Sequence, residues 1–192
     1  ILLENVSGMR STAGGQFEEA IKSYMEELGY IVNVKLINAA DYGVPQIRNR
    51  LIFVGVHTTI SSIPYEFPIG PYVNNYNTVK DAISDLPILE NNEEKIKYES
   101  KAITNYQKLM RGESDYIKIN KPKKLTNHRA PNPPINTINK IDNTIPGRPM
   151  YERFKQRIRL NLNSPSPTQL AGGIRPQFQF GHPTQARGLT IR

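Results

Sequence analysis

Three polar side chains occupy alternate positions between residues 46 and 50. Gln46, Arg48 and Arg50 belong to the segment Asp-Tyr-Gly-Val-Pro-Gln-Ile-Arg-Asn-Arg, which precedes an apolar run at residues 51–56. Because successive side chains of a strand point to opposite faces, this spacing predicts that all three lie on one face. Two guanidinium groups and an amide there need anionic or carbonyl partners, which could be structural ion pairs or a ligand.

A carboxylate and an amide close the apolar run at the start of the sequence. Ile1, Leu2 and Leu3 are followed by Glu4 and Asn5. This pattern predicts a buried parallel strand that delivers polar side chains at its carboxyl end. In open α/β sheets ligands bind at that end, so Glu4 is a candidate site residue. A strand-end carboxylate can equally pair with a helix terminus.

The elements around these residues predict an α/β fold. Apolar side chains recur at helical spacing across residues 17–28, and Gly29 is a natural end for this amphipathic helix. Residues 30–37 and 51–56 are rich in β-branched residues and predict two strands. A strand, a helix and two further strands within 60 residues predict the last part of an α/β sheet.

The sequence changes character from Thr58, where prolines and asparagines become frequent. Short helices are predicted near residues 79–86, capped by Asn77 or Thr78 and ended by Pro87, and near residues 101–110. Residues 118–181 are predicted to be mostly loops with short strands, and residues 129–134 an ordered proline-rich loop. Irregular regions of this kind commonly carry binding function.

Charge is distributed unevenly along the chain. The whole sequence has 25 Lys and Arg against 17 Asp and Glu, a formal net charge of +8. Residues 1–117 hold 11 basic and 15 acidic residues (net −4), whereas residues 118–192 hold 14 basic and 2 acidic residues (net +12). A surface this basic suits a polyanion, since Lys and Arg release counterions from phosphate backbones. A solvated lysine-rich face is the simpler alternative.

Composition excludes several kinds of site. The sequence has no cysteine, which excludes disulfides, thiolate metal sites and a cysteine nucleophile from this chain. His57, His128 and His182 lack partners at metal-ligand spacing, so no metal site is predicted and they are expected to be structural or surface residues. No apolar run is long enough for a membrane span and no secretory signal is visible, which predicts a cytoplasmic protein. The first and last residues are expected to be internal to a larger protein.

Three segments in a fixed order resemble a known family. Ile-Leu-Leu-Glu-Asn-Val at the start, Asp-Tyr-Gly-Val-Pro-Gln-x-Arg-x-Arg at residues 41–50, and Arg-Gly-Leu-Thr-Ile-Arg at residues 187–192 resemble the sixth, eighth and ninth conserved motifs of cytosine-5 DNA methyltransferases. The resemblance implies that residues 1–57 are the C-terminal part of an S-adenosylmethionine-dependent, Rossmann-like catalytic domain. Residues 58–181 would be an irregular, mixed target-recognition domain, and residues 182–192 the start of a closing motif that returns to the catalytic domain.

The resemblance also implies roles for individual residues. In this family a cysteine thiolate adds to C6 of a cytosine flipped out of duplex DNA, and negative charge then accumulates toward N3 and O2. Glu4 would bond N3 and the exocyclic amine, and Arg50, supported by Arg48, would lie near O2 and the adjacent phosphate. Asn5 and Gln46 would hold these groups in place.

The DNA contacts implied for the basic region are less specific. Candidate phosphate contacts are Arg148, Arg153, Lys155, Arg157, Arg159 and Arg175. Candidate base-reading residues are Gln169, Arg175, Gln177 and Gln179. Arg187 and Thr190 of the closing motif are expected to be structural, with Arg187 holding the two lobes in register.

The family pattern is incomplete in this sequence. The glycine-rich turn for S-adenosylmethionine, the Pro-Cys nucleophile loop and the final motif are absent. The chain is therefore expected to be inactive alone and to need the missing N-terminal half of the enzyme, either from the same parent chain or as a second subunit, with the cofactor site mostly outside this chain. A DNA-binding module without catalysis, and a tRNA-methylating enzyme of the same family, are the alternatives.

Overall fold

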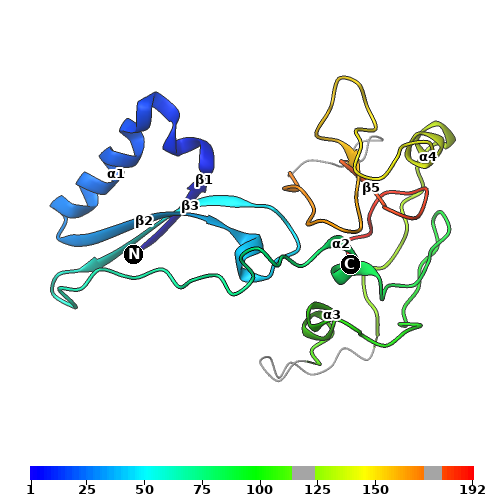
Figure 1. Cartoon of the computed structure of the whole chain (residues 1–192), viewed down its shortest axis with the longest axis horizontal. Coiled ribbons are helices and arrows are strands. Elements are labelled where there is room, and N and C mark those ends of the chain that lie inside the picture. Colours follow the sequence, from blue (N-terminus) through cyan, green and yellow to red (C-terminus); the bar gives the residue numbers. More distant parts are fainter. Residues whose placement is uncertain (114–123, 171–178) are drawn as a thin grey trace. The chain divides into compact units, whose positions relative to one another are not determined.

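The computed structural model describes residues 1–113, 124–170 and 179–192, which fall into two compact units (Figure 1). Unit 1 is Ile1–Tyr76 and unit 2 is Asn77–Arg192. Each has its own hydrophobic core. No described helix is both long and apolar enough to cross a membrane.

Unit 1 is built on a three-stranded antiparallel sheet. Its strands are β1 (Leu2–Val6), β2 (Tyr30–Asn38) and β3 (Asn49–His57), in the spatial order β1-β3-β2. Helix α1 (Gln16–Glu27) lies beside the sheet (Figure 1). Met25 of this helix packs with Leu51 and Phe53 to form the core. The helix and the two strands predicted from periodicity are confirmed, each within two residues of its expected bounds.

The first strand differs from its prediction. β1 is antiparallel to β3, and four of its five residues are exposed, whereas the apolar run predicted a buried parallel strand. The physical reason is its position, because β3 lies between β1 and β2 and leaves β1 at the edge of the described sheet. Composition alone does not distinguish an apolar edge strand from a central one. The α/β class is confirmed, and the Rossmann-like parallel sheet stays a prediction.

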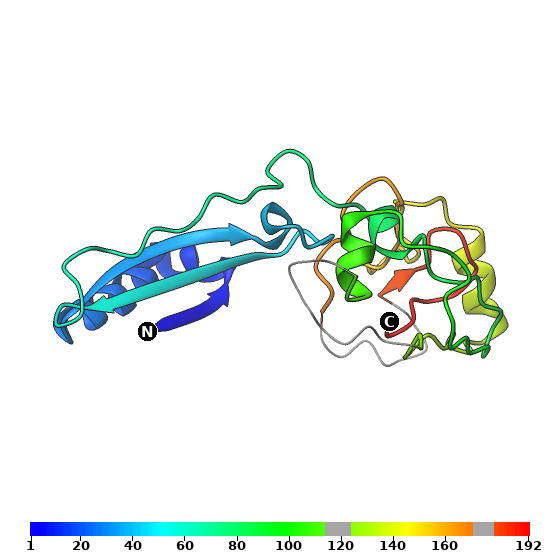
Figure 2. The ribbon, with the colours of Figure 1, turned by 90° about the horizontal axis from the view of Figure 1, so that it is seen from below.

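A segment without regular structure, residues 58–76, also belongs to unit 1. It runs alongside the sheet (Figure 2) and is attached by hydrogen bonds from Asn33 Nδ2 to the Tyr65 carbonyl (2.9 Å) and from the Tyr42 hydroxyl to the Pro68 carbonyl (2.8 Å). The structural boundary therefore follows Tyr76, although the change in sequence character begins at Thr58. The assignment of residues 58–181 to target recognition stays a prediction.

Unit 2 contains short helices joined by long loops. Its elements are α2 (Val79–Ile83), α3 (Asn105–Met110), α4 (Ile135–Asp142) and a parallel pair formed by β4 (Ile158–Arg159) and β5 (Phe180–Gly181). α2 and α3 are shorter than predicted. Each begins after a threonine, Thr78 or Thr104, that forms a capping box with the third residue of the helix.

Two buried groups of residues hold unit 2 together. Val79, Leu160 and Phe180 form the apolar core, against which Leu189 packs. The Arg111 guanidinium lies 2.7 Å (Nε to Oδ2) from the buried Asp85 carboxylate. Leu189 belongs to the closing motif, so residues 182–192 are packed within unit 2. Their return to the catalytic domain stays a prediction.

Candidate functional site

Glu4 and Arg50 come together on adjacent strands. Glu4 is opposite Ile52 in the β1–β3 register, which places it diagonally across from Arg50 on the same face of the sheet. Oε1 of Glu4 lies 2.7 Å from Nε of Arg50. These two residues lie far apart in the sequence, and the antiparallel pairing of β1 with β3 brings them together.

The pair is accessible from solvent. The Glu4 side chain is 51% exposed and that of Arg50 is 21% exposed. Leu51 and Phe53 face α1, so the alternating Arg50 and Ile52 face the opposite side of the sheet. An ion pair this exposed contributes at most about 1 kcal/mol to stability. Its placement therefore matters more for what it can bind than for the stability of the fold.

Arg50 keeps hydrogen-bonding capacity for a ligand. A guanidinium has five N–H donors. Nε faces Glu4, and NH1 donates to the Asn49 carbonyl at 2.8 Å. Within the described residues NH2 makes no hydrogen bond, so it is available to a carbonyl or phosphate oxygen. Glu4 Oε2 likewise has no partner there, which leaves one donor and one acceptor side by side.

The other residues of the alternating motif are placed differently. Gln46 and Arg48 precede β3, so the alternation of a strand applies only to Arg50. The backbone of Arg48 is fixed, because its N–H donates to Asn38 Oδ1 at 3.1 Å and its carbonyl accepts from Ala39 at 3.0 Å. Its side chain has no ion pair among the described residues. The roles of Gln46 and Arg48 stay predictions.

Asn38 organises the loop between β2 and β3 and was not predicted from the sequence. Its Oδ1 accepts from the N–H groups of Ala40 (3.2 Å) and Arg48 (3.1 Å), which spans the loop. The available signal was an asparagine at the end of a strand, a position where it commonly caps a turn. Asp41 in the same loop accepts a hydrogen bond from the Tyr76 hydroxyl, and this bond raises the pKa of Tyr76.

Asn5 lies on the other face of β1. It is opposite the buried Leu51, on the α1 side of the sheet, and its Oδ1 accepts from the N–H of Val6 at 2.8 Å. Glu4 and Asn5 therefore point in opposite directions. Asn5 can support the end of β1 but does not share a face with Arg50.

The basic candidates in unit 2 separate into exposed and buried groups. Arg148, Arg153 and Lys155 are exposed. Arg157 is half-buried and lies over the ring of Phe154, 4.4 Å from its centroid. These four remain candidates for phosphate contact. Arg175 and Gln177 lie outside the described residues.

Arg159 does not fit its predicted role. It is 9% exposed, and its NH1 donates to the carbonyls of Ile141 (3.1 Å), Asp142 (2.9 Å) and Thr144 (3.0 Å) at the end of α4. A cation at this position satisfies the unpaired carbonyls at a helix C-terminus. The structure removes Arg159 from the phosphate-contact candidates, because its guanidinium is directed at backbone carbonyls inside the unit.

The base-reading candidates are divided in a similar way. Gln179 is held by the backbone, since its Oε1 accepts from Leu170 at 2.8 Å and its Nε2 donates to Thr168 at 3.0 Å. Gln169 is exposed. Of the two base-reading glutamines that the structure describes, Gln179 is hydrogen-bonded to the surrounding loop and the side chain of Gln169 is not.

The closing motif supplies buried side chains. Arg187 is 3% exposed, with Nε donating to Gln185 Oε1 at 2.8 Å and NH1 to the Gly188 carbonyl at 2.9 Å. Burial lowers its pKa to about 10. Thr190 Oγ1 lies 3.1 Å from Nδ1 of the buried His128. These contacts fit a structural role inside unit 2, and a role of Arg187 in holding two lobes together stays a prediction.

Comparison with known proteins decides the family. The profile of C-5 cytosine-specific DNA methylases matches residues 1–192. The chain belongs to this family. The resemblance noted in the three ordered motifs is thereby confirmed, and the chain is a DNA methyltransferase homologue. Among the residues that the structure describes, no group of three or more His, Asp or Glu side chains could hold a metal ion.

Curated relatives of this chain are type II methyltransferases. Type II methyltransferase M1.HphI of Haemophilus parahaemolyticus is 30% identical over 201 residues, covering 100% of this chain and 44% of that protein. Type II methyltransferase M.AgeI of Thalassovita gelatinovora is 32% identical over 152 residues, covering 67% of this chain and 34% of that protein. The chain thus spans less than half the length of these relatives.

A solved structure supports the fold. A prophage-encoded E. coli protein assigned as a DNA modification methyltransferase superposes with a TM-score of 0.64 at 20% sequence identity. The match covers 98% of this chain and 55% of that one. At this identity the likeness concerns the fold alone.

The described residues do not fit S-adenosylmethionine, the cofactor that the methylase family implies. A nucleotide cofactor needs a glycine-rich turn between a parallel strand and a helix, where backbone N–H groups face the ligand. The loop between β1 and α1 follows an antiparallel edge strand, and residues 12–15 in it form a short 3₁₀ turn.

Proposed function

We propose that this chain forms the cytosine-binding and DNA-recognition part of a DNA (cytosine-5) methyltransferase that methylates C5 of a flipped cytosine in specific duplex sites. Residues outside this chain supply the cysteine nucleophile and the S-adenosylmethionine site. The observation that carries the proposal is the 2.7 Å contact between Glu4 Oε1 and Arg50 Nε on an accessible face of unit 1.

The pair suits one edge of a cytosine ring. N3 and O2 are neighbouring acceptors on that edge, and the exocyclic amine beside N3 is a donor. A Glu4 carboxyl can donate to N3 and accept from the amine, and an Arg50 N–H can donate to O2. Because the two side chains already touch, a single planar base can contact both. The same atoms are hidden in a duplex, so the base must be flipped out.

The roles of the pair follow from where charge develops. When an external thiolate adds to C6, electron density moves toward N3 and O2. A proton delivered from Glu4 to N3, together with the positive charge of Arg50 near O2, stabilises this density. C5 then becomes nucleophilic. Glu4 and Arg50 only stabilise this charge. The nucleophile and the site for the methyl donor are supplied by residues outside this chain.

The proposal that the chain works with further protein rests on two facts. The sequence has no cysteine, and it spans 44% of M1.HphI and 34% of M.AgeI. A mixing assay tests it. This chain is combined with a polypeptide that carries the cofactor and Pro-Cys motifs, and labelled methyl transfer to duplex DNA is followed. Absence of transfer, under conditions where the intact parent enzyme is active, would contradict the split-enzyme form of the proposal.

The substitution Glu4→Gln in the intact parent enzyme tests the role of the carboxylate. We expect methyl transfer to fall by about 100-fold or more, as for other groups that stabilise developing charge. The dissociation constant for duplex DNA should change by a few-fold at most. Glu27→Gln on the exposed end of α1 is the matched control and should leave both unchanged.

The same experiment addresses the alternative of a DNA-binding module without catalysis. Such a module would use the basic surface and would have no need for the Glu4–Arg50 pair. If methyl transfer and DNA binding fell equally in Glu4→Gln, Glu4 would be structural and the proposal for the site would fail.

A further inference from the structure

A hairpin in unit 2 spans residues 148–159. Its two arms are joined by hydrogen bonds from the Met150 N–H to the Arg157 carbonyl (2.8 Å) and from the Arg159 N–H to the Arg148 carbonyl (3.1 Å). An antiparallel bridge lies between these two bonds. The arms therefore hold the loop between Met150 and Arg157 in a defined position.

The hairpin is anchored at its base in the interior of unit 2. Met150 is buried, and the buried Arg159 is bonded to the backbone carbonyls at the end of α4. Ile158 pairs in parallel with Phe180 of β5. An anchored loop loses less conformational entropy when it binds a ligand than a free loop does.

The loop of the hairpin combines aromatic and basic side chains. Residues 151–157 hold two aromatic residues, three basic residues and one acidic residue. Phe154 is 39% exposed. Its two neighbours in the sequence, Arg153 and Lys155, are also exposed. An aromatic ring thus lies between two cationic residues at the surface of unit 2.

Arg157 is stacked on the rings of this loop. Its Cζ lies 4.4 Å from the centroid of the Phe154 ring and 5.8 Å from that of Tyr151. The Nζ of Lys140 in α4 lies 5.0 Å from the centroid of Tyr151. Contacts between a cation and an aromatic ring are attractive, so they help to hold Phe154 and Arg157 in place. The hairpin therefore presents a preformed surface of aromatic rings and positive charge.

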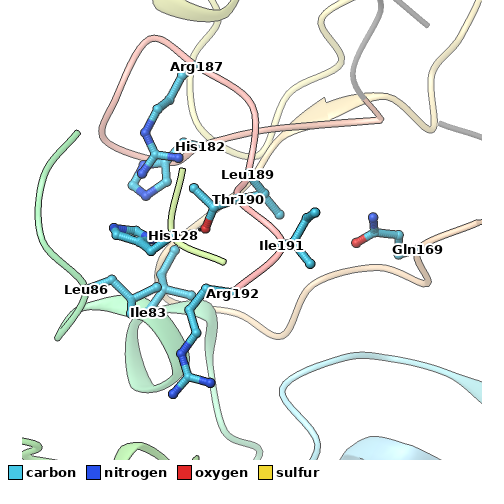
Figure 3. Close-up of a pocket in the computed structure, with 10 residues that line it drawn as sticks. All are labelled: Ile83, Leu86, His128, Gln169, His182, Arg187, Leu189, Thr190, Ile191 and Arg192. Carbon is cyan, nitrogen blue, oxygen red and sulfur yellow. Dashed lines mark hydrogen bonds between the residues drawn. The ribbon is translucent and has the colours of Figure 1, made fainter. Parts of the chain in front are cut away.

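Other arginines of the basic region are used inside unit 2. Arg187 is 3% exposed and lies beside His182 (Figure 3). Arg159 is directed at backbone carbonyls. Arg153 and Lys155 differ from these two arginines because they reach solvent. The hairpin thus places positive charge where a polyanion can contact it.

We propose that Phe154, with Arg157 stacked on it, is a platform for a DNA base that lies outside the helical stack, and that Arg153 and Lys155 contact the flanking phosphates. Each base of a DNA strand lies between two phosphates, as Phe154 lies between two cationic residues. Stacking on an aromatic ring accepts any base, because every base has a π face.

The platform needs a base whose face is open. In a paired duplex neighbouring bases cover both faces, whereas base flipping takes a base out of the stack and disturbs its neighbours. The platform therefore rests on the proposed function in one respect, which is that flipping supplies the unstacked base.

Binding of the intact parent enzyme to two duplexes tests the platform. One duplex carries a single bulged, unpaired adenine, and the other has the same sequence without the bulge. Phe154→Leu keeps an apolar side chain but removes the ring, so we expect binding to the bulged duplex to weaken about fivefold or more. Binding to the paired duplex should change by about twofold at most. Equal changes with the two duplexes would overturn the proposal.

Two further variants identify the aromatic ring as the cause. Phe154→Tyr keeps an aromatic face and should bind the bulged duplex as the wild-type enzyme does. Phe17→Leu makes the same change as Phe154→Leu at an exposed ring on α1 and should have no effect. A loss in either variant as large as that of Phe154→Leu would contradict the platform.

Salt dependence and thermal unfolding distinguish stacking from two indirect effects. Stacking releases no counterions, so Phe154→Leu should leave the salt slope of DNA binding unchanged. A slope smaller by about 1 would mean that the ring only holds Arg157 against a phosphate, and stacking would be ruled out. A lower unfolding temperature with unchanged DNA affinity would assign Phe154 to packing within the parent enzyme and would also overturn the proposal.

The bulged duplex presents an unstacked base without methyl transfer. The binding test of Phe154 and the methyl-transfer assay of Glu4→Gln can therefore fail separately. Loss of the Phe154 effect would leave the role of Glu4 in place, and a structural role of Glu4 would leave the platform in place.

Discussion

Arg50 has a geometry at the candidate site that another cation cannot reproduce. Its Nε contacts Glu4, NH1 reaches the Asn49 carbonyl, and NH2 is left for a ligand. A lysine at this position would keep the charge but would lose the planar arrangement of donors. Comparing arginine with lysine at position 50 therefore separates the effect of directional hydrogen bonding from the effect of charge.

Arg50→Lys in the intact parent enzyme is expected to lower the rate of methyl transfer by about 10-fold or more, with a smaller change in DNA affinity. The measurement is single-turnover methyl transfer alongside DNA titration. Arg10→Lys is the control, because Arg10 forms a comparable 2.9 Å pair with Glu18 away from the site. Equal losses in both variants would show that Arg50 acts through stability alone.

His182 makes the stability of unit 2 sensitive to acid. Burial, followed by the positive charges of Arg187 and Arg159, lowers the pKa of His182 to about 3. Below the ordinary histidine pKa of about 6.5 the unfolded chain binds a proton that the folded chain does not. Folding is thus favoured most above that value, and this advantage is lost as pH falls toward 3.

Because of this residue, the free energy of unfolding is expected to decrease by up to about 1.4 kcal/mol per pH unit as the pH falls from 6 to 4. Denaturant titrations at several pH values measure it. Carboxylates contribute to the same range, so the comparison is with His182→Gln, whose pH dependence should be shallower. Parallel curves for the two proteins would show that His182 titrates normally.

At the scale of elements, close backbone contacts hold residues 58–76, which follow β3, against the loop between β2 and β3. A Cβ added at Gly70 would lie 2.4 Å from the Asp41 carbonyl oxygen, closer than real atoms approach. The neighbouring N–H of Tyr72 donates to that same carbonyl at 3.0 Å. The absence of a side chain at Gly70 therefore lets residues 58–76 dock against the loop between β2 and β3.

Gly70→Ala is expected to destabilise unit 1 by roughly 1–3 kcal/mol, because the obstructing atoms are backbone and cannot rotate away. Chemical denaturation of the chain provides the measurement. Gly8→Ala is the matched control, since a Cβ there meets nothing within 4 Å, and its effect should stay within about 0.5 kcal/mol. A similar stability for both variants would rule out the close contact at Gly70.

At the scale of the whole molecule, the uneven charge predicts how DNA is held. Residues 118–192 carry a net charge of +12, and four of the described basic residues in this region, three exposed and one half-buried, remain candidates for phosphate contact. If each of these contacts one phosphate, the logarithm of the DNA association constant should fall with the logarithm of salt concentration at a slope of roughly −4.

Filter binding or fluorescence titration of the intact parent enzyme at several salt concentrations measures this slope. Lys155→Gln should reduce its size by about 1 and weaken binding similarly for all DNA sequences. Lys108→Gln, an exposed change on α3 outside the candidate set, should leave the slope unchanged. A flat salt response would mean that the basic region faces solvent.

The sequence by itself determined the features that depend on neighbouring residues or on short motifs in order. Helical periodicity located α1, β-branched runs located β2 and β3, and three ordered motifs identified the methylase family. It also proposed Glu4 and Arg50 as partners in one site. The described parts of residues 118–181 are largely loops, as expected, because few repeating apolar positions occur there.

Only the tertiary structure decided which side chains are buried and which strands pair. Ile141 at the end of α4 is fully buried, although asparagine and threonine give this helix a weak local signal. Arg159 and Arg153 look alike in sequence, yet the first is enclosed at the end of α4 and the second is exposed. β1 was predicted to be a buried parallel strand, and within the described sheet it pairs antiparallel with β3. Burial and pairing depend on segments far apart in the chain, and neither local periodicity nor composition records which segments meet.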